Sequence, residues 1–176
     1  DTQSVSPYTD DEVKDLFSAL QDIYICYAAH IENSTKPKAF PLYELKDLAG
    51  NHKYKNKTST ERTVSYKNSN TVWLSDLVRV AYFMTCFYTG ANASSLLKLR
   101  LSDFSEGLFK DLNRKTYKLN TKKGRQSGRT NEIDVGFTKD ARSFFESWIS
   151  VSKKINKDEN SFLFPNPSIN NKSYMT

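Results

Sequence analysis

Cysteine, histidine and glycine are all scarce in this chain of 176 residues. Its two cysteines, Cys26 and Cys86, both lie within apolar helical patterns. We therefore expect two reduced core residues rather than a disulfide or a metal-binding pair. His30 and His52 are far apart and have no cysteine at ligand spacing, so the sequence predicts no metal site.

A long hydrophobic run is also missing. The longest apolar stretch, Val78 to Tyr88, is too short to span a bilayer, and no signal peptide is visible. We expect no membrane partner and a cytoplasmic protein. A chain of 176 residues that is 38% hydrophobic is long enough to bury a core, which predicts a single domain over residues 1–176.

Positive charge is in excess, and the excess is concentrated in one segment. The whole chain has 26 basic and 20 acidic residues, a net charge of +6. Between Lys110 and Thr130, eight basic residues and one acid, Asp111, give a net charge of +7. This favours a polyanionic partner, although a lysine-rich turn also occurs as a solvated loop without a ligand. The eight are Lys110, Arg114, Lys115, Lys118, Lys122, Lys123, Arg125 and Arg129.

Hydrophobic periodicity predicts four helices. Thr9-Asp10-Asp11-Glu12 is a capping box that opens a helix extending to about Ile31. The most buried helix is expected over residues 72–87, ended by Gly90, and a short one follows over residues 93–99. Thr138 caps the last helix, whose core-facing residues are Ala141, Phe144, Phe145, Trp148 and Ile149.

Between the third and fourth helices, the apolar period changes to two. Tyr117 and Leu119 alternate with polar residues, as do Ile133, Val135 and Phe137, and Leu108-Phe109 adds a short strand. The expected fold class is therefore α+β, mainly α-helical with a small three-stranded antiparallel sheet. Residues 50–70 are expected to form a long basic loop.

The segment Thr89-Gly90-Ala91-Asn92-Ala93-Ser94-Ser95-Leu96-Leu97-Lys98-Leu99 resembles the tyrosine recombinase box, Thr-Gly-x-Arg-x-x-Glu-Leu-x-x-Leu. Lys122-Lys123-Gly124-Arg125 followed by Ile133-Asp134-Val135 resembles the second strand of that catalytic domain, its lysine-bearing turn and its third strand. Phe162-Leu163-Phe164-Pro165 is similar to the segment that leads to the family's later catalytic residues. The resemblance covers the N-terminal two-thirds of such a domain, of the phage integrase type.

The resemblance implies cleavage of DNA by a tyrosine without metal or cofactor. In the family, arginines stabilise the negative charge on the scissile phosphate, and a lysine protonates the leaving oxygen. The catalytic lysine corresponds to Lys122, with Lys123 as the alternate. Asn92 stands at the position of the first box arginine and Ser95 at that of the box glutamate. Asn92 is too short for bidentate reach, and it is also a common turn or cap residue.

The functional expectation is DNA binding within site-specific recombination or integration. The chain to Thr176 contains no counterpart of the family's His-x-x-Arg motif or nucleophilic tyrosine, and Tyr174 is taken as an ordinary residue. We expect no cleavage by this chain alone, a nucleoid location, and a free monomer that forms multimers on double-stranded DNA. The alternatives are a non-catalytic, regulatory relative or an unrelated basic domain that binds RNA or protein. The expected DNA-binding residues are Lys118, Lys122, Lys123, Arg125 and Arg129.

Overall fold

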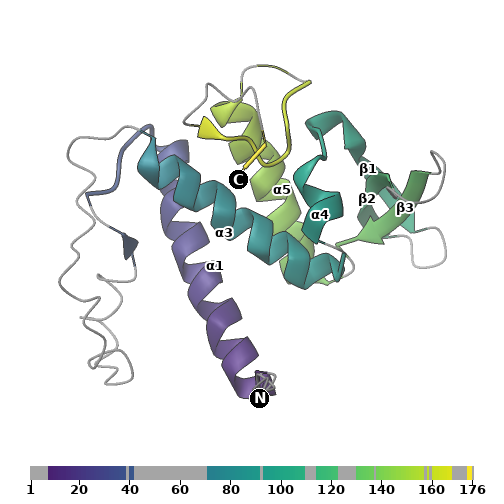
Figure 1. The fold of residues 1–176 in the computed structure, drawn as a ribbon, viewed down its shortest axis with the longest axis horizontal. Helices are drawn as coiled ribbons and strands as arrows, with labels where there is room; N and C mark the ends of the chain where they lie inside the picture. Colours follow the sequence, from purple (N-terminus) through teal and green to yellow (C-terminus); the bar gives the residue numbers. More distant parts are fainter. Residues whose placement is uncertain are drawn as a thin grey trace, which may run out of the picture.

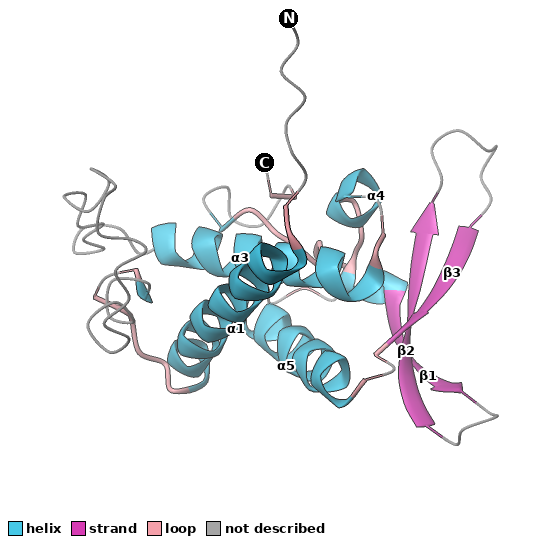
Figure 2. Ribbon diagram, turned by 90° about the horizontal axis from the view of Figure 1, so that it is seen from below, coloured by secondary structure: helices cyan, strands magenta, loops and turns pink. Residues whose placement is uncertain are grey.

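The computed structural model describes most of the chain outside residues 42–70. The described residues are 8–38, 40–41, 71–91, 93–109, 114–122, 130–136, 138–156, 158, 160–167 and 174–175. Within them the chain is mainly helical with a small antiparallel sheet, which confirms the expected α+β class. The sheet lies at one end of the molecule, and the long helices α1 (Asp10–Glu32), α3 (Val72–Thr89) and α5 (Lys139–Ile155) cross one another beside it (Figures 1 and 2). The predicted basic loop at residues 50–70 lies outside the described residues.

Helix α1 (Asp10–Glu32) begins as the capping box predicts. The Thr9 hydroxyl accepts a hydrogen bond from the Glu12 amide at 3.3 Å, and the Glu12 carboxylate accepts one from the Thr9 amide at 2.8 Å. These two bonds satisfy backbone N–H groups that the first turn would otherwise leave without partners. The C-terminal half of α1 buries Ile23, Tyr24 and Tyr27, whereas its first turns extend away from the rest of the fold (Figure 1).

Helix α3 (Val72–Thr89) is the most apolar helix, as predicted, and packs along α1. It is antiparallel to α1, because Trp73 near its start contacts Tyr27 while Phe87 near its end contacts Phe17. Gly90 ends the helix in the left-handed conformation (φ 59°), where its amide donates to the Cys86 carbonyl at 2.9 Å. A glycine takes this conformation without the steric cost of a Cβ atom.

The sheet contains β1 (Phe104–Phe109), β2 (Arg114–Lys122) and β3 (Thr130–Val135), in the order β1-β2-β3 with antiparallel pairing throughout. The short helix α4 (Ala93–Leu97) and the 3-10 helix η4 (Leu101–Asp103) precede it. Tyr117 and Leu119 of β2 are buried against the helices. The sheet therefore contributes one face to the core.

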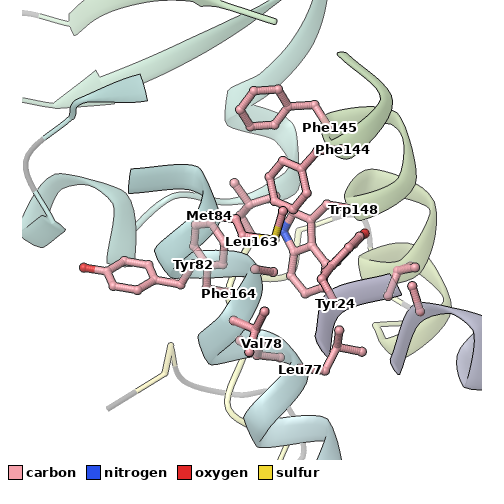
Figure 3. Packing of buried hydrophobic residues seen from close by; sticks show 14 of the residues in the cluster. Tyr24, Leu77, Val78, Tyr82, Met84, Phe144, Phe145, Trp148, Leu163 and Phe164 are labelled. Atoms are coloured by element: carbon pink, nitrogen blue, oxygen red, sulfur yellow. The ribbon is translucent and has the colours of Figure 1, made fainter. Parts of the chain in front are cut away.

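Helix α5 (Lys139–Ile155) starts at Thr138, whose hydroxyl accepts from the Ala141 amide at 3.2 Å, as predicted. Its apolar side chains meet those of α1 and α3 in one core (Figure 3). Trp148 is at the centre, stacked on Phe164 with ring centroids 5.9 Å apart and edge-on to Tyr24. The predicted core residues of α5 are buried, except Ile149, which is partly buried.

The segment after α5 returns to the middle of the fold. The Leu163 amide donates to the Leu99 carbonyl at 2.8 Å, and the Leu101 amide donates to the Ser161 carbonyl at 2.9 Å. Leu163 and Phe164 are fully buried. These hydrogen bonds and buried side chains thus fix residues 161–164 against the chain that leaves α4.

Candidate nucleic-acid interface

Strand β2 contains two of the predicted DNA-binding cations, Lys118 and Lys122, and its residues alternate between two faces. Tyr117 and Leu119 are buried, while Lys118 between them is on the opposite face and half-buried. In the ladder, Lys118 is opposite Asp134 of β3 on one side and Ser105 of β1 on the other. A carboxylate directly across from a lysine reduces the local positive potential.

The ladder becomes less acidic toward the end of β2. Asp134 is opposite Lys118 and Glu132 is opposite Asn120. The last two rungs pair Thr121 with Asn131 and Lys122 with Thr130, and contain no carboxylate. The carboxylates of the β2–β3 ladder therefore end two rungs before residues 123–129, the connection to β3. Strand alternation predicted β2 and β3, but it could not find Asp134 as the neighbour of Lys118, because alternation does not fix the register.

The predicted DNA-binding residues are described to different extents. Lys118 and Lys122 belong to β2, and Lys122 is in its terminal rung. Lys123, Arg125 and Arg129 lie outside the described residues, as does Asn92. The structure therefore places two of the cations on one strand and leaves the position of the others as a prediction.

The turn before Asn92 is well defined. The Thr89 hydroxyl donates to the Thr85 carbonyl at 2.7 Å and accepts from the Ala91 amide at 3.1 Å. Together with the left-handed Gly90, these bonds fix the path of the chain out of α3 up to Ala91. The next helix, α4, begins at Ala93.

Helix α4 brings this turn close to the basic strand. It contacts both α3 and β2, and its Leu96 side chain is fully buried. The two views agree that α4 lies between the end of α3 and the sheet (Figures 1 and 2). Two segments that are separated by some twenty residues, the Thr89-Gly90 turn and β2, are thus held in one part of the fold.

Arg100 is engaged elsewhere. Its guanidinium group lies 4.5 Å from the centroid of the Phe162 ring and donates to the carbonyl of Asn160. Its amide donates to the Asp103 carboxylate at 2.8 Å. Arg100 therefore packs against the segment after α5. It does not lie in α4, which ends at Leu97, two residues earlier than predicted for this helix.

Tyr174 is packed against the segment that follows α5. It pairs with Pro165 through an isolated β-bridge, and its ring meets the edge of Phe162 with centroids 5.6 Å apart. Phe162 thus lies between Arg100 and Tyr174. The interpretation of Tyr174 as an ordinary residue stays a prediction.

Among the described residues no group of three or more histidine, cysteine or carboxylate side chains could hold a metal ion. No helix in the described part of the chain is long and apolar enough to cross a membrane. Comparisons of the chain with protein-family models, curated proteins and solved structures found no match.

Proposed function

We propose that this chain binds the sugar-phosphate backbone of double-stranded DNA through the β2–β3 end of its sheet, as part of a tyrosine recombinase-type catalytic domain. The single observation that supports this most is the distribution of carboxylates along the β2–β3 ladder: Asp134 opposes Lys118, Glu132 opposes Asn120, and none stands in the last two rungs. The sequence of the β2–β3 connection continues the positive charge with Lys123, Arg125 and Arg129.

Cations at the end of a β-ladder suit a phosphate backbone for a physical reason. Each lysine or arginine that neutralises a phosphate releases condensed counterions, so binding is driven by entropy and weakens with salt. Such contacts position a protein on DNA without reading its sequence. The two acids of β3 that lie opposite the middle of β2 favour contact at the terminal rungs instead.

Asn92 supports binding rather than rapid strand cleavage. A neutral amide at the position of the box arginine removes a bidentate charged donor to the scissile phosphate. Loss of one preorganised donor typically reduces the rate by about 10²–10³. We therefore propose a role in DNA binding during recombination or integration, in the cytoplasm at the nucleoid, with multimers forming on the DNA.

The test is the affinity of the protein for a labelled duplex, measured by fluorescence anisotropy at salt concentrations from about 50 to 200 mM. We expect a steep negative slope of log affinity against log salt. Lys122→Ala and Arg125→Ala should each make the slope shallower by about one unit. Lys153→Ala is the matched control, because it removes an exposed cation at the end of α5.

A flat salt dependence, or equal effects of Lys122→Ala and Lys153→Ala, would contradict the proposal. Competition with single-stranded RNA in the same assay tests the alternative of an RNA-binding domain. RNA that displaces the duplex at equal concentration would favour that alternative.

A further inference from the structure

Large apolar side chains are exposed on two neighbouring helices. On α1, Leu16 is 47% exposed, and on α3, Phe83 and Phe87 are 51% and 40% exposed. Leu20 of α1 is partly buried beside them. Side chains of this size are usually covered when they cluster on a surface, so their exposure indicates a binding face.

These four residues share one flank of the α1–α3 pair. Helix α5 covers the other flank, where Tyr24 of α1 and Tyr88 of α3 both contact Phe144. On the helical wheel Phe83 is about 140° from Tyr88 and Leu16 is about 80° from Tyr24, so neither side chain points in the direction of the Phe144 contacts. We call Leu16, Leu20, Phe83 and Phe87 the apolar flank.

The floor of the apolar flank is already packed. The rings of Phe17 and Phe87 meet edge to face with centroids 5.3 Å apart, and Phe17 makes a similar contact with Tyr88 at 5.2 Å. These contacts hold the N-terminal half of α1 and the C-terminal half of α3 together while the outer apolar atoms stay exposed. The surface is therefore preformed, which lowers the entropy cost of binding.

The electrostatics of this helix pair differ from those of the whole chain. Between Asp10 and Glu32, six carboxylates and one lysine give α1 a net charge of −5, with histidine neutral. Asp76 and Arg79 cancel on α3, where they form a salt bridge at 3.5 Å. The chain as a whole carries +6. An apolar surface on an acidic helix favours a partner with apolar and basic side chains.

A second copy of this chain fits the surface poorly. Pairing two apolar flanks would bring two helices of charge −5 together, which is repulsive. The basic sheet of another copy matches the charge but offers no exposed large apolar side chain among the residues whose side chains the structure describes. Among the described residues, the exposed large hydrophobic side chains are confined to α1, α3 and Tyr8.

We propose that the apolar flank docks a basic amphipathic helix of another protein, with apolar side chains against Phe83 and Leu16 and lysine or arginine toward the acidic face of α1. An amphipathic helix presents anchors at i, i+3 or i+4, and i+7, a spacing that suits a surface formed by two helices. This site contains none of the residues proposed to bind DNA, and the proposal does not depend on DNA binding.

The probe is a labelled synthetic peptide of leucine and lysine, about 18 residues long, with leucine at helical spacing. Two further peptides share its design: one has the same composition in scrambled order, and the other has glutamate in place of lysine. We expect the patterned lysine peptide to bind, and Leu16→Ser and Phe83→Ser each to weaken it at least about tenfold. Amide chemical-shift changes should be confined to the N-terminal half of α1 and the C-terminal half of α3.

Ile25→Ser is the matched control. Ile25 is 65% exposed on α1 but lies about half a turn around the helix from Leu16, so its loss should leave the affinity unchanged. Because all three variants change exposed or half-exposed residues, circular dichroism should show them folded. Equal binding of the scrambled or glutamate peptide, or equal effects of Ile25→Ser and Phe83→Ser, would overturn the proposal.

Two other occupants are tested with the same variants. A dimer in sedimentation velocity that Phe83→Ser dissociates would assign the apolar flank to a second copy and overturn the proposal. Binding to phosphatidylcholine vesicles that Phe83→Ser abolishes would assign it to a lipid surface, with the same consequence. The proposal is supported if the protein is a monomer that does not bind the vesicles but does bind the patterned lysine peptide. Failure of DNA binding would leave all of these outcomes unaffected.

Discussion

Helices α1, α3 and α5 bury aromatic side chains between them, whereas the sheet buries one face through Tyr117, Leu119 and Val135. The two regions also differ in the sign of their charge. Helix α1 carries −5, and the segment from Lys110 to Thr130, which contains β2, carries +7. Most of the buried aromatic core thus lies in the helices, whereas the positive charge is concentrated in the segment that contains β2. Substitutions in the helices should change mainly the free energy of unfolding, and substitutions of cations at the end of β2 should change mainly the salt dependence of binding.

The largest effect is expected at the centre of the helical region. Trp148 is 1% exposed and stacks on Phe164, so Trp148→Ala leaves a cavity that its neighbours fill only in part. We expect the free energy of unfolding to fall by about 3–5 kcal/mol, measured by urea unfolding followed by circular dichroism. Glu146→Ala, at an exposed position of the same helix, is the control and should change it by less than about 0.5 kcal/mol. A loss below about 1.5 kcal/mol for Trp148→Ala would mean that the core can repack without the indole ring.

Local signals explain why the helical region was the more predictable one. A capping box at Thr9, a cap at Thr138 and a left-handed glycine at Gly90 each act over one helical turn, so the sequence around them contains the whole interaction. The strands of the sheet could be predicted from alternation for the same reason. Their bounds were less exact, since β1 begins at Phe104 rather than near Leu108.

Long-range contacts were not predictable from the sequence. The hydrogen bond from Tyr24 to Ser147 joins residues 123 positions apart, and no local pattern relates them. The bridge between Arg100 and Phe162 is a single pair, too short to produce periodicity. The same limit applies to the candidate interface, where the register that sets Asp134 against Lys118 comes from the pairing and not from either strand alone. The predicted residues Asn92, Lys123, Arg125 and Arg129 remain predictions.

A smaller effect is expected where the two regions join. Gly136, between β3 and α5, has φ +82°, and a Cβ atom there would lie 3.2 Å from the Tyr117 ring and 3.3 Å from the Arg142 side chain. Gly136→Ala should cost about 2 kcal/mol, because strain in the left-handed region adds to these close contacts. Gly90→Ala is the matched control, with φ +59° and no atom of the described residues within 4 Å of the added methyl group. It should cost about 1 kcal/mol, and an equal loss for both would show that the sheet moves away from α5 without cost.

The smallest effect should come from one buried hydroxyl in the helical region, and its sign should change with pH. The Tyr24 hydroxyl donates to the Ser147 hydroxyl at 2.8 Å, and burial raises the pKa of Tyr24 above its ordinary value. Near neutral pH, Tyr24→Phe should lower the free energy of unfolding by about 1 kcal/mol, the usual contribution of such a hydrogen bond. Above about pH 10, the unfolded chain releases the Tyr24 proton while the folded protein keeps it, so the wild type loses stability as pH rises, at up to about 1.4 kcal/mol per pH unit from this group. Phenylalanine has no proton to release. The free energies of unfolding of the two proteins, measured in urea from neutral pH to about pH 11, should therefore converge as the pH rises and then cross.

Ser147→Ala is the control that separates the hydrogen bond from the ionisation. It removes the hydrogen bond but keeps the ionisable hydroxyl of Tyr24, so it should retain the full loss of stability at alkaline pH. If Tyr24→Phe stays less stable than the wild type by the same amount up to about pH 11, the Tyr24 hydroxyl ionises as easily in the folded protein as in the unfolded chain.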